Sequence, residues 1–192
     1  EILGGKKGDY KIVHPNDHVN MSQSTNDTVP TSMRIAGLFM AEGLTAELKQ
    51  LEKALSDKSK EFDNIIKSGR THLQDAVPIR LGQEFCSYST AISKTIKRIQ
   101  RAAEELKELG IGATAAGTGI NTHPAYRKLV IKALKEITGI KDLKPADDMP
   151  EAINSMADFV NLSAMLRGLA IELIRIANDL RLLSSGPRTG FA

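Results

Sequence analysis

The sequence predicts an all-α fold, an elongated bundle of long antiparallel helices. Apolar residues recur at intervals of three and four over long stretches, which is the spacing of one helix face. Aromatic residues make up only 4% of the 192 residues and Trp is absent, so the core must be aliphatic. Strand-like alternation of useful length is missing, apart from a short run at residues 10–13.

Two long helices are expected in the first half of the chain. The first follows Pro30 and Thr31, and its leucines keep a 4-3-4 spacing at Leu44, Leu48, Leu51 and Leu55. The second begins near Pro78, because proline suits a first helical turn, and it ends at the glycine-rich residues 110–119. Its apolar stripe consists of Leu81, Phe85, Tyr88, Ile92, Ile96, Ile99, Ala103 and Leu106.

The second half predicts a shorter helix at residues 126–137, closed by Gly139, and a last helix from about Pro150 to Ser184 with Gly168 as its weak point. At ~1.5 Å per residue the last helix would be roughly 50 Å long. A compact chain of this size has a radius of gyration of only ~16 Å. We therefore expect the helices to oligomerise through their apolar stripes.

The composition excludes several classes of protein. The balance of 26 basic and 23 acidic residues gives a net charge of +3, too small to indicate nucleic-acid binding. Cys86 is the single cysteine, so no internal disulfide can form, and no Cys/His cluster has the spacing of a zinc site. No apolar run approaches the ~20 residues of a membrane span. We expect a cytoplasmic protein with no metal, cofactor, nucleic-acid or membrane partner.

Both ends of the chain look internal. The first residue is Glu1 rather than Met, and residues 1–3 resemble the last turn of a helix that Gly4 and Gly5 close. The chain stops just after a Gly/Pro/Arg turn. We therefore expect a piece of a longer protein, which could hold only part of a site.

Three polar segments interrupt the helical pattern. The first, residues 14–31, holds Ser24, Thr25 and Asn26 in front of the first helix. Their O–H and N–H groups could bind a carboxylate with the help of the helix N-terminus. The same residue types cap helices, so a capping cluster is the alternative.

The second segment, residues 68–78, holds Thr71 and His72 in an expected turn. Histidine can hold a carboxylate or pass a proton near neutral pH, and the alternative is a solvated turn in which Asp75 caps the helix. The third segment, residues 112–124, contains a Gly-x-Gly that lacks the spacing of a dinucleotide site. Its small residues could let the backbone approach a helix or a ligand closely, or could simply connect two helices.

Taken in order, these segments resemble the aspartase/fumarase superfamily of lyases. The resemblance covers essentially the whole chain, and four long blocks carry it: HPNDHVNMSQSTNDTVPT at 14–31, GRTHLQDAVPIRLGQEF at 69–85, GATAAGTGINTHP at 112–124 and NDLRLLSSGPR at 178–188. It implies that residues 1–30 end an N-terminal region with the polar substrate-binding segment. Residues 31–192 would then form the central helical-bundle domain, truncated before the catalytic serine loop. The resemblance also implies a homotetramer whose active sites each combine segments of three subunits.

The implied reaction is a reversible anti-elimination across C2–C3 of a four-carbon dicarboxylate, which gives fumarate. Loss of the C3 proton builds an aci-carboxylate, whose charge preorganised donors must meet. In the family, the stretch matching Ser24, Thr25 and Asn26 binds substrate, and so does the position matching Thr71. The histidine matching His72 binds a substrate carboxylate and has been given acid/base duties. His72 is therefore the catalytic candidate, with carboxylate binding as its safer role.

Further positions follow from the same resemblance. His14, Asn16 and Asp17 match a second anion site described in fumarases, in which His18 occupies a position that is often acidic. The family's base is a serine on a flexible GSSxMPxKxNP loop, which has no match in the 192 residues. If these residues are the entire molecule, we expect negligible lyase activity.

The leaving group distinguishes two reactions of the family. Thr as the second residue of 24–26, together with residues 112–114 and 182–185, favours release of ammonia from L-aspartate. Residues 121–124 favour release of water from malate, the fumarate hydratase reaction. A catalytically inactive helical assembly fragment of such an enzyme is the third alternative.

Overall fold

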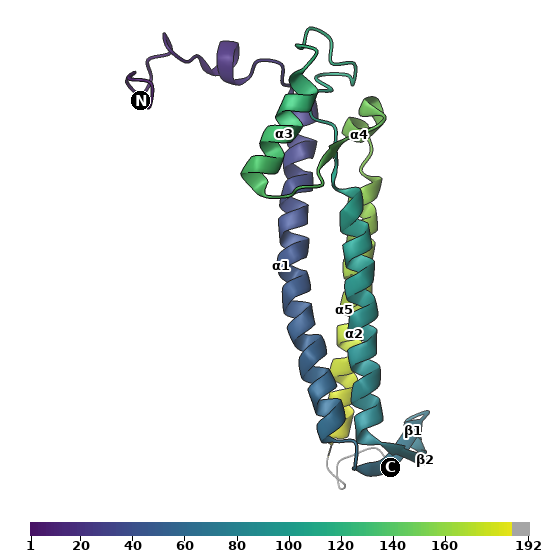
Figure 1. Ribbon diagram of the computed structural model, residues 1–192. Helices are drawn as coiled ribbons and strands as arrows, with labels where there is room; N and C mark the ends of the chain where they lie inside the picture. The colour runs from purple at the N-terminus through teal and green to yellow at the C-terminus, as the bar shows by residue number, and fades with distance from the viewer. Residues whose placement is uncertain (186–192) are drawn as a thin grey trace. The chain divides into compact units, whose positions relative to one another are not determined.

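The computed structural model describes residues 1–185, and these form mostly long helices (Figure 1), so the all-α fold class is confirmed. The chain divides into two compact units, each described by itself below. Unit 1 consists of Glu1–Leu38 and Glu105–Met156, and unit 2 of Phe39–Glu104 and Ala157–Ala192. Helix α1 (Thr25–Glu61) continues through residue 30 without a break. The domain boundary expected there stays a prediction.

Unit 1 combines the first turns of α1 with several short elements. These are η1 (Pro15–Val19), α3 (Tyr126–Thr138), α4 (Met149–Asn154) and the parallel pair of β3 (Glu108–Leu109) with β4 (Lys144–Pro145). A small core joins the glycine-rich segment to α4, formed by Ala113, Ala146, Met149 and Ala152 with Ile153 against them. Gly139 ends α3 in the left-handed conformation, as expected, and its N–H donates to the Lys135 carbonyl at 3.0 Å.

Unit 2 is a helical bundle with a hairpin. The rest of α1 runs beside α2 (Leu81–Glu105) and α5 (Ala157–Leu183), with α2 antiparallel to the other two (Figure 1). The hairpin of β1 (Ile66–Thr71) and β2 (Gln74–Arg80) connects α1 to α2. The Ser89 hydroxyl on α2 donates to the Glu52 carbonyl on α1 at 3.1 Å, which fixes the two helices in register.

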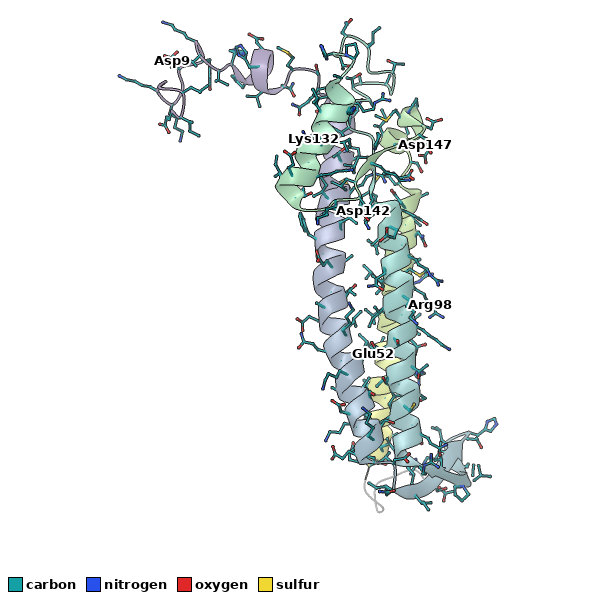
Figure 2. The ribbon with its side chains drawn as sticks, viewed as in Figure 1. Asp9, Glu52, Arg98, Lys132, Asp142 and Asp147 are labelled. Atoms are coloured by element: carbon teal, nitrogen blue, oxygen red, sulfur yellow. The ribbon has the colours of Figure 1, made fainter. Side chains whose placement is uncertain are left out.

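The predicted apolar stripes form the core of unit 2. The α2 stripe is buried from Tyr88 onward and includes Ile92, Ile96 and Ile99. Helix α1 adds Leu48 and Leu55 to this core, and α5 adds Leu162, Leu169 and Ile176. Leu44 and Leu51 are half-buried. Charged side chains such as Arg98 project from α2 into solvent (Figure 2), which gives the helix its two faces.

The first helix begins earlier than expected, at Thr25 rather than after Thr31, and Pro30 lies inside it. Proline removes one helical hydrogen bond and crowds the carbonyl four residues back. Hydrogen bonds made by Ser24 and Asp27 stabilise the first turn and offset that loss. Proline was therefore a poor marker of the helix start.

The turn expected at Thr71 and His72 is present at His72, but the helix expected from Pro78 is not. Residues 66–80 form an antiparallel hairpin, in which Pro78 pairs with Ser68 and Asp75 pairs with Arg70, so α2 begins only at Leu81 and Asp75 does not cap it. The strands are almost fully exposed. Apolar and polar residues alternate along a strand only when one of its faces is buried. Neither face of this hairpin is buried, so its sequence does not alternate.

Two other local expectations are also wrong. The last helix is broken at Ser155, which is extended (φ −80°, ψ 136°), whereas Gly168 lies within α5. Residues 10–12 form turns rather than a strand. Residues 1–3 form a single turn that Gly4 closes in the left-handed conformation (φ 85°), as expected, and its N–H donates to the Glu1 carbonyl at 2.9 Å. None of the helices among residues 1–185 is both long and apolar enough to cross a membrane.

Truncation of a core residue tests the assignment of the α2 stripe. Ile92 is 0% exposed, so Ile92→Ala is expected to lower the free energy of unfolding by about 2–5 kcal/mol through lost burial and a residual cavity. The matched control Ile137→Ala, at a site 81% exposed, should change it by less than about 1 kcal/mol. Urea unfolding followed by circular dichroism measures both, and similar losses would contradict the assignment.

Candidate functional site

The first polar segment forms a helix cap. The Ser24 hydroxyl oxygen accepts a hydrogen bond from the Asn26 N–H at 3.2 Å, and Asp27 Oδ1 accepts one from the Ser24 N–H at 2.9 Å. This reciprocal pattern is a capping box with aspartate in the third helical position. The capping alternative is therefore correct for Ser24. Thr25 and Asn26 are exposed beside it, at the positive end of the α1 dipole.

The first and third polar segments lie together in unit 1. Asp27 is 0% exposed, and its Oδ2 accepts hydrogen bonds from the N–H groups of Gly112 at 3.1 Å and Thr114 at 2.8 Å. The Asn26 side-chain Nδ2 donates to the Ala115 carbonyl at 2.7 Å. Two segments more than 80 residues apart in sequence are thus fixed against each other.

The glycine-rich segment is shaped by close packing. Gly112 (φ 87°) and Gly117 (φ 100°) adopt conformations that side chains rarely tolerate. A Cβ at Gly117 would come within 2.6 Å of Pro150, and one at Gly110 within 2.7 Å of Ile153. The small residues let the backbone approach α4 closely, which was one of the two expectations for this segment.

Asp27 was not among the predicted site residues, although a sequence signal marks it. Serine followed three residues later by an acidic residue is the pattern of a capping box. The burial of its carboxylate has no such signal, because the glycine-rich segment that covers it is remote in sequence. Burial raises the pKa of Tyr126, and the negative charge of Asp27 raises it further, so this phenol stays protonated beside the carboxylate.

Thr71 and His72 lie at the tip of the hairpin in unit 2. His72 (φ 52°) and Leu73 (φ 61°) both have positive φ, which makes a two-residue turn that matches the twist of the paired strands. Within residues 1–185, no hydrogen bond engages either the His72 imidazole or the Thr71 hydroxyl. Both groups are exposed and available to a ligand.

A pocket of about 350 Å³ in unit 2 includes His72. Its cations and anions are largely paired: Lys67 lies 2.9 Å from Glu84, and Arg175 lies 3.2 Å from Asp179. Burial raises the pKa of Tyr88 in this pocket, and the Asp179 and Glu84 carboxylates add to the effect, so its phenol remains a proton donor. The Lys67–Glu84 pair joins β1 to α2 and holds the hairpin in place.

The residues of the second predicted site meet in η1. His14 Nδ1 accepts hydrogen bonds from the N–H groups of Asn16 at 3.2 Å and Asp17 at 3.1 Å. His18 Nδ1 accepts one from the His14 N–H at 2.8 Å. Both imidazoles therefore accept hydrogen bonds from backbone N–H groups of this segment. A carboxylate at position 18 could accept the bond from the His14 N–H in the same way. Anion binding by His14, Asn16 and Asp17 stays a prediction.

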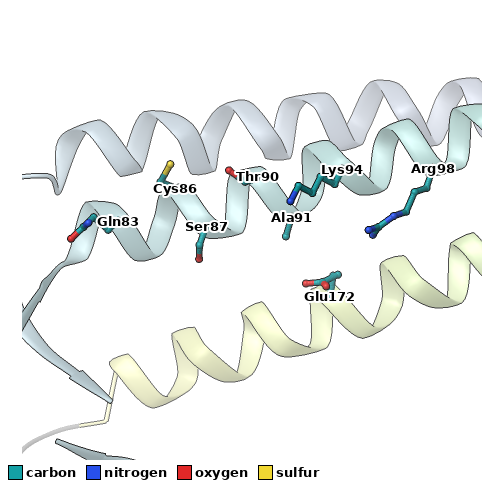
Figure 3. A pocket seen from close by; sticks show the side chains of 8 residues that line it. All are labelled: Gln83, Cys86, Ser87, Thr90, Ala91, Lys94, Arg98 and Glu172. Atoms are coloured by element: carbon teal, nitrogen blue, oxygen red, sulfur yellow. The ribbon is translucent and has the colours of Figure 1, made fainter. Parts of the chain in front are cut away.

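A larger groove of about 650 Å³ contains none of the predicted site residues. It lies between α2 and α5, and Figure 3 shows Lys94 and Arg98 extending from α2 and Glu172 from α5. The Glu172 carboxylate already pairs with Arg175 at 2.9 Å. In the part of the chain that the structure describes, no group of three or more His, Cys, Asp or Glu side chains could hold a metal ion.

Comparison with known proteins assigns the chain to a family. A family model described as lyase matches residues 1–192. The chain belongs to this lyase family. The chain is 48% identical over 192 residues to the aspartate ammonia-lyase of Bacillus subtilis. That match covers 100% of this chain but 40% of the relative, so the chain spans about two fifths of the length of the curated relatives it matches.

Solved structures support the same family. A fumarate lyase:delta crystallin from Brucella melitensis, bound to cobalt, has a TM-score of 0.94 and 46% identity over 98% of this chain and 41% of that one. The class II fumarase from Schistosoma mansoni has a TM-score of 0.90 and 35% identity over 98% of this chain and 42% of that one. The predicted resemblance is confirmed. Residues 186–188 of the fourth block lie outside the described residues.

The two-residue turn at the hairpin tip can be tested by a substitution. Leu73→Gly removes the cost of a side chain at positive φ, and after glycine's entropic cost we expect a gain of about 0.5–1 kcal/mol in hairpin stability. The control Leu129→Gly, at an exposed position inside α3, should lose about 1 kcal/mol. Hydrogen exchange of the hairpin and α3 amides measures the two changes, and faster hairpin exchange in Leu73→Gly would refute the turn.

Proposed function

We propose that the complete protein is an aspartate ammonia-lyase, which reversibly eliminates ammonia from L-aspartate to give fumarate. One observation carries the proposal: exposed Thr25 and Asn26 stand at the N-terminus of α1, in a chain whose relatives bear that name. Ser24, Thr25 and Asn26 bind the substrate in this proposal, together with Thr71. Its second anion site consists of His14, Asn16 and Asp17.

The arrangement at the start of α1 suits the charge that the reaction creates. Loss of the C3 proton gives the adjacent carboxylate a second negative charge. The α1 dipole adds positive potential at this point. The Asn26 amide is an oriented donor, because it is bonded to the Ala115 carbonyl, and the exposed Thr25 hydroxyl is a second donor. The cap and Asp27 fix the backbone that carries both groups before substrate arrives.

His72 supplies the catalytic imidazole in the proposal, with binding of a substrate carboxylate as its first role. Its exposed position at a tight turn supports this, since a dicarboxylate can reach the ring from solvent. Positive φ at two consecutive residues other than glycine is strained, and such strain concentrates at functional sites. Arg70 precedes the turn and adds a positive charge to the same pocket.

We propose a homotetramer whose active sites combine segments of several subunits. Helix α5 supports this, because it has two apolar faces. One is buried within unit 2 and carries Leu162, Leu169 and Ile176, seven residues apart. The other lies on the opposite side of the helix and is exposed, with Val160, Ile171 and Ile174 each more than 60% accessible. A helix that is apolar on opposite sides needs a second covering surface.

The cell compartment proposed for this enzyme is the cytoplasm. The single thiol, Cys86, is exposed and free. Free exposed thiols persist where the environment is reducing.

Activity of the full-length protein decides the reaction. We expect fumarate to appear from L-aspartate, followed by its ultraviolet absorbance, with no fumarate from malate. His72→Ala should lower kcat/KM by roughly 100-fold or more, because the imidazole is lost. Asp75→Asn, on the opposite strand of the same hairpin, should stay within threefold of the original. Turnover of malate alone would instead establish a fumarate hydratase, and turnover of neither would favour an inactive assembly module.

Sedimentation of the full-length protein tests the tetramer. We expect a single tetrameric species, and Ile171→Asp should dissociate it by placing a charge on the exposed face of α5. The matched control is Ile137→Asp, which places the same charge at an exposed position of α3 and should leave the tetramer intact. A monomer in the unaltered protein, or dissociation by the control alone, would contradict the assignment of the α5 face.

A further inference from the structure

We propose that Asp27 is a positioning residue of the substrate site, which acts through the backbone it binds rather than by touching substrate. Its buried carboxylate fixes the donors of Thr25 and Asn26 against the glycine-rich segment 112–115. It thereby sets how tightly the site binds its dicarboxylate. This inference rests on the proposed function, because it assigns substrate binding to residues 24–26.

The contacts of Asp27 divide between its two oxygens. Oδ1 accepts from the Ser24 N–H and closes the cap of α1. Oδ2 accepts from the N–H groups of Gly112 and Thr114 and holds the glycine-rich segment. Three backbone donors converge on one side chain that is 0% exposed. Buried N–H groups are costly to leave without acceptors, so the start of α1 and the glycine-rich segment should move together or not at all.

Only a carboxylate satisfies this arrangement. An asparagine at position 27 would keep one acceptor oxygen and turn an NH2 group toward backbone N–H donors on the other side. The amide could keep either the cap at Ser24 or the bonds to Gly112 and Thr114. Asp27→Asn therefore separates the helix start from the glycine-rich segment, with almost no change in side-chain volume.

The partner segment is itself held in an uncommon conformation. Thr114 has φ 61°, which is strained for a β-branched residue, and this conformation aims its N–H at Asp27. The Gly117 and Gly119 N–H groups both donate to the Ala113 carbonyl, at 3.1 and 2.9 Å, and they tighten the same loop. Strain of this kind persists only where surrounding bonds enforce it, and the bond to Asp27 is one of these.

The ligand side of the segment depends on the same connection. Asn26 donates one amide hydrogen to the Ala115 carbonyl, one residue beyond Thr114. The bond orients the amide and leaves its second hydrogen as a donor, on a residue that is exposed like its neighbour Thr25. If residues 112–115 shift, the Asn26 amide loses the hydrogen bond to the Ala115 carbonyl that orients it. Asp27 thus controls a group that it does not contact through its side chain.

Kinetics of the full-length protein with Asp27→Asn provide the main test. Loss of a preset binding segment weakens binding of the substrate carboxylate, so KM should rise at least tenfold, and weaker stabilisation of the aci-carboxylate should lower kcat as well. The control is Asp148→Asn, which makes the same chemical change at the cap of another helix: Asp148 Oδ1 accepts from the Glu151 N–H at 2.9 Å at the start of α4, and the asparagine oxygen can keep this one bond. Its KM should stay within twofold of the original.

A double substitution separates positioning from general loss of stability. If Asp27 acts through Asn26, then Asn26→Ala should raise KM strongly in the original protein but less than threefold when Asp27→Asn is already present. In the Asp148→Asn background it should have its full effect. Independent effects of the two substitutions at 26 and 27 would overturn the inference.

A readout that needs no activity distinguishes this inference from the proposed function. Hydrogen exchange of the Gly112 and Thr114 amides should accelerate at least tenfold in Asp27→Asn, while α3 amides keep their rates. If the unaltered protein shows neither turnover nor binding of succinate, the proposed function fails, whatever the exchange rates. If it turns over aspartate and Asp27→Asn keeps the original KM, this inference alone fails.

Should Asp27→Asn not fold, Asp27→Glu decides. Glutamate retains the charge and both oxygens and is common in the third position of a capping box, so the helix cap should survive. Its extra methylene moves the carboxylate, so that no glutamate oxygen occupies the place of Asp27 Oδ2 between the Gly112 and Thr114 N–H groups. A KM raised at least threefold with an intact circular dichroism spectrum supports the inference, and an unchanged KM overturns it.

Discussion

The buried carboxylate of Asp27 is the interaction on which the arrangement of unit 1 depends. It accepts hydrogen bonds from the start of α1 and from a loop more than 80 residues later, and no water reaches it. Backbone N–H groups that are removed from water require acceptors. One side chain therefore joins two polar segments into a single surface with Thr25 and Asn26 on the outside.

In unit 2, the polar side chains of Thr71 and His72 are carried by the β1–β2 hairpin, which ion pairs hold against the helices. A two-stranded hairpin by itself is only marginally stable in water. Here it is joined to helices by the Lys67–Glu84 pair and by the pairing of Arg80 with Asp63 at 3.0 Å. The Lys67–Glu84 pair is partly buried, so salt screens it less than the exposed Arg80–Asp63 pair. The hairpin can therefore carry a strained turn at its tip, where His72 is exposed.

Helices were easier to predict than the remaining elements for a physical reason. Burial of one face imposes a spacing of three and four on apolar residues, and the stripe from Tyr88 to Leu106 follows it closely. The hairpin at 66–80 buries almost nothing, so its sequence carries no corresponding pattern. Its turn also lacks the Asn-Gly or Gly pair that usually marks such turns. The break at Ser155 has a similar origin, because packing of α4 against the glycine-rich segment places it.

The sequence by itself determined the helical class, the inward faces of the bundle, the end of α3 at Gly139 and, through four long motifs, the family. It also marked the polar residues at 24–26 and 71–72, since small donors and an imidazole between helical patterns are conspicuous. Only the tertiary structure decided that Ser24 caps α1, that Asp27 is buried, and that His72 lies at a strand turn. The spacing of apolar residues along the chain shows which face of a helix is buried. The partners of a buried polar group such as Asp27 depend instead on which backbone, remote in sequence, packs over it in the folded protein.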